Sequence, residues 1–103
     1  MVFHPIVSLE ATQHEIGRAI EINHTGLSII CKETFQVDEI LDLFIADDYL
    51  EELKEKKLEI TAKVLRCKIA KNGNYEIGFQ ILKIKNPDGD LLINKMTRLL
   101  GGL

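Results

Sequence analysis

The chain of 103 residues has little of several features that define large protein classes. It contains no tryptophan, two prolines and two cysteines. Cys31 and Cys67 form no CxxC pair and lie within apolar runs, which indicates two packed, reduced thiols, with a disulfide across neighbouring strands as the alternative. No apolar run is long enough to cross a bilayer, and no signal peptide opens the chain. We therefore expect a cytoplasmic protein without membrane insertion.

Aromatic side chains and positive charge are also scarce. Six aromatics and a net charge of −3 argue against DNA or RNA as a partner, because nucleic-acid binding uses basic surfaces and stacking rings. Residues 1–62 carry 5 Lys and Arg against 13 Asp and Glu, whereas residues 63–103 carry 8 against 3. This division predicts either two oppositely charged surfaces or two halves that complement each other within one domain, 1–103.

Residue patterns for catalysis and metal binding are missing as well. His4, His14 and His24 stand ten residues apart, which is not a metal-ligand spacing. The serine and threonine hydroxyls have no evident His/Asp partners, and there is no phosphate-binding glycine loop. The turn at 87–90 lacks the further oxygen ligands of a calcium loop. We predict no enzyme, no metal site and no cofactor.

The chain does have repeated alternation of apolar and polar residues, which is typical of half-buried strands. Closing such strands into a barrel removes exposed edges. The alternation predicts six short, mostly antiparallel strands, at Val7–Thr12, Ile16–Ile22, Leu27–Cys31, Leu41–Ile45, Leu58–Ile69 and Tyr75–Ile81.

Several local features accompany this pattern. His14-Glu15 is the expected tight connection before the second strand, in which Arg18, Ile20 and Ile22 should share one face. A change of phase at Leu65 predicts a β-bulge. Asn72-Gly73 predicts a type I′ hairpin turn, because both residues tolerate positive φ. A glycine inside the last strand, Gly78, suits a close backbone approach or strong curvature.

Two segments change to helical spacing. Residues 47–57 start acidic and end basic, which predicts a short helix capped at Asp47 or Asp48. A second helix should start at 87–90, cover the barrel and stop at Gly101-Gly102. Its expected apolar stripe is Leu91, Leu92, Met96, Leu99 and Leu100. The predicted fold is therefore mainly β: a small six-stranded antiparallel β-barrel with a short mid-chain helix and a C-terminal helix.

The segment Gly17–Ile30, GRAIEINHTGLSII, resembles the second and third strands of PilZ domains, small bacterial receptors for the dinucleotide messenger cyclic di-GMP. The family's [D/N]xSxxG motif aligns on Glu21, Asn23 and Gly26, of which the glycine is retained. ITAKVLRCKI and NGNYEIGFQILKI resemble the family's last hairpin, and a closing amphipathic helix also fits. The resemblance covers about residues 6–100 and implies a six-stranded antiparallel barrel with a C-terminal helix.

The departures from the family bear on function. PilZ domains that bind the messenger carry RxxxR just before the first strand, and its arginines contact guanine and phosphate. No arginine precedes Arg18 here, unless the sequence is a piece cut from a longer chain. Glu21 adds repulsion toward a doubly anionic ligand. We predict weak or absent cyclic di-GMP binding, with Gly26 serving the turn through positive φ or a tight strand entry, and Asn23 through its own backbone.

Two main hypotheses follow from the resemblance. The first is a non-enzymatic bacterial adaptor of the cyclic di-GMP pathway that acts through a protein partner, for instance in motility. The second is a true cyclic di-GMP receptor in which Arg18 and Arg66 replace the missing pair, and both guanidinium groups then point toward the loop 23–26. An oligonucleotide-binding barrel is disfavoured by charge. A basic strip either faces an acidic partner or is simply solvated: Lys63, Arg66, Lys68, Lys71, Lys83 and Lys85.

Overall fold

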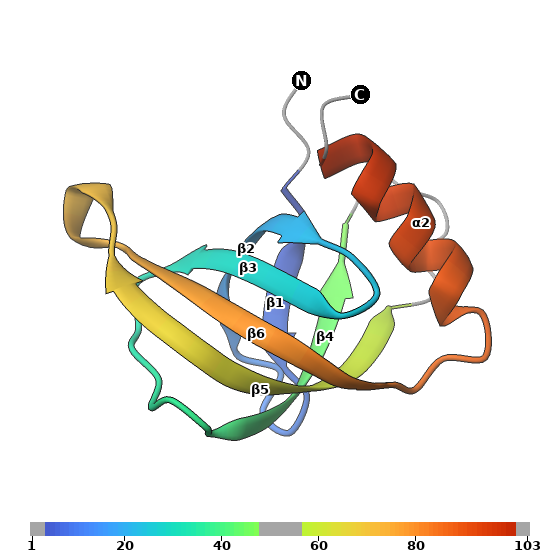
Figure 1. Ribbon diagram of the computed structural model, residues 1–103, viewed down its shortest axis with the longest axis horizontal. Helices are drawn as coiled ribbons and strands as arrows, with labels where there is room; N and C mark the ends of the chain where they lie inside the picture. The colour runs from blue at the N-terminus through green and yellow to red at the C-terminus, as the bar shows by residue number, and fades with distance from the viewer. Residues whose placement is uncertain (1–3, 48–56, 101–103) are drawn as a thin grey trace.

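The computed structural model describes residues 4–47 and 57–100, and these form a closed antiparallel barrel with one helix packed against it (Figure 1). The strand order around the barrel is β1-β2-β3-β6-β5-β4. This confirms the six-stranded barrel and the C-terminal helix. The elements are β1 (Ile6–Leu9), β2 (Glu15–Ile22), β3 (Gly26–Cys31), β4 (Ile40–Ala46), β5 (Leu58–Ile69), β6 (Tyr75–Ile84) and α2 (Gly89–Leu100).

The core is made by the inward positions of every strand. Along the first half of β5, Leu58, Ile60, Ala62 and Val64 are fully buried, and the residues between them are partly exposed. This is the period of two expected of a strand with one face on the core. Both cysteines are free thiols, and burial raises the pKa of the Cys31 thiol. The interior is thus a packed core built by alternation.

β-Bulges change the phase of this alternation at several points. The pairing of β5 with β6 shifts between Val64 and Arg66, which leaves Leu65 as the extra residue and confirms the predicted bulge. The pairing of β2 with β3 shifts between Ala19 and Glu21, which leaves Ile20 as the extra residue of a second bulge. The expectation that Arg18, Ile20 and Ile22 share one face is therefore wrong: Ala19 and Ile22 are buried, and Arg18 is exposed.

The two outer hairpin turns behave differently. In the β5–β6 turn, Asn72 and Gly73 have φ of 60° and 74°, as predicted, and the Asn74 amide donates to Lys71 O at 3.1 Å. β1, however, ends at Leu9, so Ala11 and Thr12 belong to a turn over 10–14 rather than to a strand. The connection predicted at His14-Glu15 is thus longer than expected and spans residues 10–14. Gln13 adopts a φ of 58° within it, and Glu15 already begins β2.

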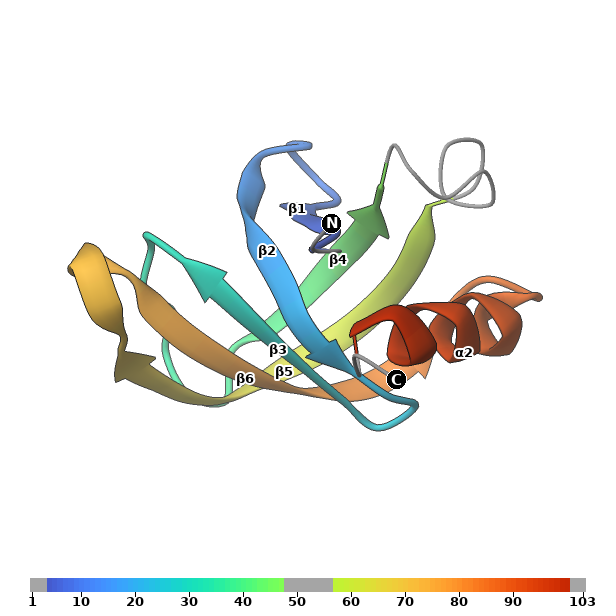
Figure 2. The ribbon, with the colours of Figure 1, turned by 90° about the horizontal axis from the view of Figure 1, so that it is seen from above.

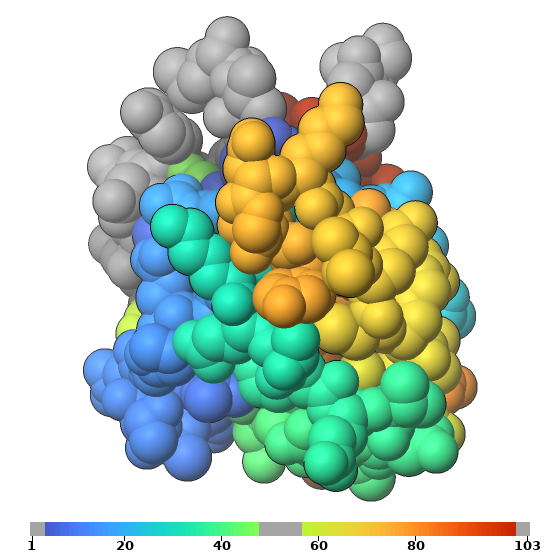
Figure 3. Space-filling model, turned by 90° about the vertical axis from the view of Figure 1, so that its left-hand side faces the viewer, coloured from blue at the N-terminus to red at the C-terminus, as the bar shows by residue number. Residues whose placement is uncertain are grey.

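The antiparallel strand order gives the barrel two distinct ends. At the loop end lie the connections 10–14, 32–39 and 70–74; Figure 3 views the barrel from this side, with the β5–β6 turn at the top and residues 32–39 below it. At the helix end lie the β2–β3 turn, residues 23–25, and α2, which contacts β2 and β5 (Figure 2). The Thr97 hydroxyl donates to Ile22 O at 2.8 Å and ties the helix to the end of β2.

The helix buries a narrower stripe than its sequence predicts. Leu92, Ile93 and Met96 are buried against the barrel, whereas Leu91 and Leu99 are exposed, which corrects the expected stripe at those two positions. The three buried residues have the spacing i, i+1 and i+4, which places them on one face of the helix, against the barrel. The predicted mid-chain helix at 47–57 lies almost entirely outside the described residues; Asp47, which is described, is not helical.

Candidate functional site

The motif residue Glu21 and one distant arginine share a row of paired residues across four strands. Glu21 pairs with Ser28, Ser28 pairs with Gly78, and Gly78 pairs with Arg66. Residues paired in this way project from the same face of a sheet, and here that is the outer wall of the barrel, because Phe79 and Val64 beside them are buried inside. The row brings the motif on β2 and β3 next to the last hairpin.

Arg66 lies across the glycine of this row. A Cβ added to Gly78 would meet Arg66 Cζ at 3.1 Å and Arg66 Nη1 at 3.2 Å, closer than most real contacts of a Cβ. The guanidinium therefore extends from β5 over β6 toward β3 because position 78 has no side chain. A close backbone approach is one of the two alternatives predicted at Gly78; the group that approaches is instead a side chain, the guanidinium of Arg66.

This arrangement leaves a shallow shelf of about 220 Å³ on the barrel wall. Its lining includes the small residues Gly26, Ser28 and Gly78, and the charged side chains that line it are Glu21 and Arg66. The other lining residues are Asn23, Thr25, Leu27, Leu65 and Phe79. The shelf thus gathers Glu21, Asn23, Gly26 and Arg66 of the predicted site, with one positive and one negative charge.

The side chain of Asn23 is engaged by its own turn. Its Oδ1 accepts from the Thr25 amide at 2.9 Å, the Gly26 amide at 2.9 Å and the Thr25 hydroxyl at 3.0 Å. The Asn23 amide donates to Gly26 O at 2.9 Å, which closes the hairpin. Asparagine at the first position and glycine at the fourth are the preferences of an ordinary type I turn. The acceptor that would face a ligand is therefore already used.

The backbone conformation at position 26 does not require a glycine. Gly73 is the glycine with positive φ among the described residues, so of the two alternatives for Gly26, positive φ or a tight strand entry, the first does not apply. A Cβ at Gly26 would have Phe79 O at 3.5 Å and Asn23 Oδ1 at 3.8 Å, both ordinary contacts. The fold tolerates a side chain at this position. What the glycine does is keep the floor of the shelf open.

His24, at the tip of the same turn, joins it to the helix. Its Nε2 lies 3.0 Å from Asn94 Oδ1, and its Nδ1 lies 3.3 Å from Asp90 Oδ1. The sequence gives no signal for this contact, because the partners are 66 and 70 residues away and a histidine in a turn is unremarkable on its own. The side chain of His24 consequently joins the turn beside the shelf to α2.

Arg18 belongs to a different part of the wall. It pairs with Ile30, one row beyond Glu21, and its Nη1 donates to His4 O at 3.3 Å. It lines a separate hollow with Glu15, Lys32 and Glu33 near the loop end. Of the two arginines predicted to replace the missing pair, the structure brings Arg66 to the loop 23–26 and leaves Arg18 apart from it.

Some residues of the predicted basic strip form ion pairs with described residues and others do not. Lys85 leaves it, because its Nζ lies 2.9 Å from Glu10 Oε2 and 3.0 Å from Asp42 Oδ1. Lys68 lies 3.6 Å from Glu76 Oε2 on the neighbouring strand. No ion pair to a described residue is formed by the other four, Lys63, Arg66, Lys71 and Lys83. Within residues 4–47 and 57–100 no cluster of His, Cys, Asp or Glu has the makings of a metal site.

Comparison with known proteins matches this geometry to one family. The sequence profile of the PilZ domain matches residues 4–98. A solved structure of Bacillus subtilis inhibitor of motility (MotI/DgrA) superimposes with a TM-score of 0.72 at 20% sequence identity, over 100% of this chain and 50% of the other. The chain thus spans half the length of that protein. No curated protein matches the sequence. No described helix is long and apolar enough to span a membrane.

Proposed function

Since this chain belongs to the PilZ domain family, we propose that it is a non-enzymatic adaptor of cyclic di-GMP signalling in the bacterial cytoplasm, acting through protein contacts rather than through the messenger. The observation that carries the proposal is the charge of the shelf. Glu21 and Arg66 line it together, so its formal charges cancel. The similar MotI/DgrA structure is that of an inhibitor of motility, which supports motility as the class of process.

The physics of the messenger favours this proposal. Cyclic di-GMP carries two phosphates, and arginine pairs bind such groups by bidentate hydrogen bonds. One arginine opposite a carboxylate offers no comparable clamp. The shelf of about 220 Å³ is also smaller than the usual range of small-molecule sites, roughly 300–1,000 Å³. With the Asn23 acceptor engaged by its own turn, the shelf offers few groups to orient a guanine.

The outer face of the β5–β6 hairpin supports the protein-contact part of the proposal. Leu65 and Leu82 are the extra residues at two bulges and are 47% and 46% exposed. Lys63, Arg66 and Lys83 are their neighbours along the two strands and have no ion-pair partners among the described residues. Exposed apolar side chains next to cations suit a partner whose apolar contact is flanked by acidic groups. This basic hairpin face is the adaptor's first expected contact surface.

A true receptor with a variant site is the second candidate, and two observations favour it. Arg66 lies against the motif loop without an ion-pair partner, and Gly26 keeps the shelf open although the fold has room for a side chain. In that case Arg66 alone supplies the guanidinium contact. A single stacking or bidentate arginine gives weaker binding than a pair.

Isothermal calorimetry with cyclic di-GMP at moderate salt distinguishes the two. We expect no saturable heat for the wild-type chain up to millimolar ligand. Arg66→Ala and the exposed hairpin variant Lys71→Ala serve as the matched pair. Micromolar binding that survives Lys71→Ala but is lost in Arg66→Ala would overturn the adaptor proposal and assign the shelf to the messenger.

A further inference from the structure

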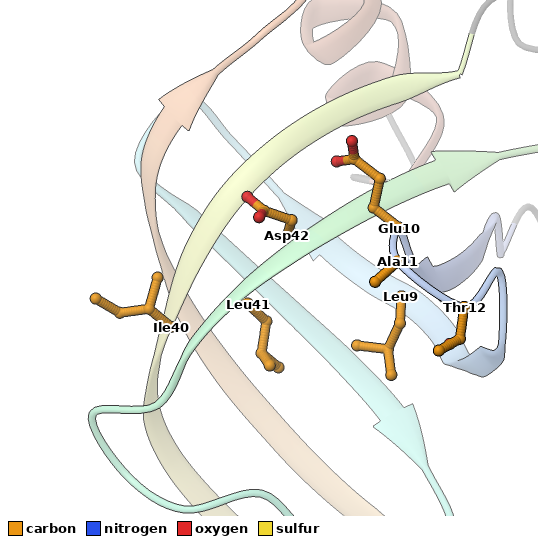
Figure 4. A pocket seen from close by; sticks show the side chains of 7 residues that line it. All are labelled: Leu9, Glu10, Ala11, Thr12, Ile40, Leu41 and Asp42. Carbon is orange, nitrogen blue, oxygen red and sulfur yellow. The ribbon is translucent and has the colours of Figure 1, made fainter.

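A second hollow lies at the loop end of the barrel, away from the shelf. It has a volume of about 410 Å³ and is formed by the β1–β2 turn and the start of β4 (Figure 4). Leu9 and Leu41 point to one side of these two segments, and the carboxylates of Glu10 and Asp42 point to the other (Figure 4). We call this the β1–β4 groove, lined by Leu9, Glu10, Ala11, Thr12, Ile40, Leu41 and Asp42.

The apolar part of the groove is incompletely covered. Leu9 and Leu41 are partly buried and pack on the core from the loop end. Ile40, at the edge of the groove, is 60% exposed, and Val37 in the adjoining connection is 56% exposed. Large exposed aliphatic side chains gathered beside an open hollow are typical of contact sites. The groove therefore offers an apolar anchor point for a side chain from outside.

The charges around the groove are predominantly negative. Asp38 and Glu39 directly precede Ile40, and both are exposed. Glu10 and Asp42 point away from Leu9 and Leu41, on the other side of the two segments (Figure 4), and Lys85 lies between the two carboxylates, within 2.9 and 3.0 Å of their oxygens. Lys63 of β5 pairs with Ile40, so two lysines stand against four carboxylates and the formal charge around the groove is −2. The groove is thus opposite in sign to the basic hairpin face.

We propose that the β1–β4 groove docks a segment of a partner protein in which a leucine-like side chain is flanked by lysines or arginines. The apolar anchor enters between Leu9, Leu41 and Ile40, and its cationic neighbours meet the acidic rim. A closed barrel has no free strand edge, so strand addition is not available and a partner must use a face or an end.

This inference deepens the adaptor proposal and rests on it for its biological sense. An adaptor needs two contact surfaces, and the basic hairpin face is one of them. A second surface of opposite charge selects a different partner, because like charges across an interface repel. The groove supplies that second surface, at residues that do not line the shelf.

The test is an NMR titration of the ¹⁵N-labelled full chain with two capped hexapeptides, KKLLKK and EELLEE. KKLLKK is expected to give saturable shifts at amides 9–12 and 38–42, and EELLEE to leave these amides unchanged. Ala11→Lys adds a cation to the groove at an exposed turn position and should weaken KKLLKK binding about tenfold or more. Leu91→Lys, an exposed helix position, should leave binding unchanged.

The spectrum of Ala11→Lys away from the groove verifies that the variant is folded. Equal shifts with both peptides, shifts that are absent from 9–12 and 38–42, or unchanged binding in Ala11→Lys would each overturn the inference. Shifts confined to the basic hairpin face on addition of EELLEE would leave the adaptor proposal standing while the groove fails. Cyclic di-GMP binding at the shelf is read at residues 21–28, so the two failures are distinguishable.

Discussion

The two ends of the barrel are finished in different ways. At the helix end, α2 buries Leu92, Ile93 and Met96, and Thr97 and His24 connect the helix to β2 and to the β2–β3 turn. At the loop end, Leu9 and Leu41 are only partly buried, and the carboxylates of Glu10 and Asp42 point to the other side of the same segments (Figure 4). At the helix end, α2 covers the apolar side chains of the barrel. The other end presents apolar groups to the surroundings, which is where a partner gains most by binding.

The comparison also locates the candidate messenger site. The shelf lies beside the helix end, within reach of the turn that His24 attaches to α2. The β1–β4 groove lies at the loop end and shares no lining residue with the shelf. The shelf and the β1–β4 groove can therefore each be altered without touching the other, whereas the basic hairpin face shares Leu65 and Arg66 with the shelf.

The largest contrast between the two ends should appear in core truncations. Ile93→Ala removes a fully buried side chain from α2 and is expected to cost about 3–4 kcal/mol of unfolding free energy. Leu41→Ala removes a half-buried one at the loop end and should cost about 1–2 kcal/mol, because less apolar area leaves water on folding. Urea denaturation of both variants measures the difference. Equal costs would contradict the unequal burial of the two ends.

Two glycines give the next contrast. A Cβ at Gly17, on β2, would lie 2.3 Å from Ile30 O and 2.7 Å from Cys31 Cβ, so the backbone of β3 must move. Gly17→Ala should therefore cost about 2–3 kcal/mol. Gly26→Ala meets ordinary contacts and should cost less than about 1 kcal/mol. Thermal unfolding of the pair checks the ranking, and a strongly destabilised Gly26→Ala would restore a conformational role for that residue.

A smaller effect is expected where the helix is attached to β2. Thr97→Val keeps the shape of the side chain but removes the hydrogen bond to Ile22 O, at a cost of about 1 kcal/mol. Thr34→Val, in the exposed β3–β4 connection, is the matched control and should be close to neutral. Denaturant midpoints of the two variants decide the point. A neutral Thr97→Val would mean that packing alone holds the helix end.

The smallest effect is electrostatic and belongs to the loop end. The Thr61 hydroxyl, which donates to Asp42 Oδ1 at 2.7 Å, is the main cause that lowers the pKa of Asp42, and Lys85 adds to it. Because the folded pKa lies below the ordinary value of 3.8, this contribution to stability is present above that value. It is lost as the pH falls through the lowered folded pKa.

Carboxyl NMR titration of Asp42 checks this assignment. Thr61→Val should move the pKa of Asp42 upward more than Lys85→Gln does, because the Thr61 hydrogen bond is the larger cause. The reverse order would mean that the lysine governs the acidic rim of the β1–β4 groove.

Much of the fold was predictable because alternation is a local property. The six strands, the bulge at Leu65 and the Asn72-Gly73 turn all follow from residues close together in sequence. The errors arise where a bulge or a turn alters the phase. The bulge at Ile20 exchanges the faces of β2, and the early end of β1 at Leu9 depends on the long turn after it. Alternation gives no signal for either event.

The candidate site was predictable in part. The motif residues Glu21, Asn23 and Gly26 meet on one shelf because they are neighbours on one hairpin. Arg66 joins them through strand order, since β6 lies between β3 and β5 and Gly78 opens a path across it. Arg18 is closer in sequence yet lies one row away. Proximity along the chain was a poorer guide than pairing across the sheet.

The most direct test of the adaptor proposal is a protein-detected NMR titration with cyclic di-GMP. We predict that amides of residues 21–28, 64–67 and 77–80 keep their positions at millimolar ligand, because Glu21 opposes the single cation of the shelf. Saturable shifts of these amides at micromolar ligand, absent in Arg66→Ala, would contradict the account and make the chain a receptor for the messenger.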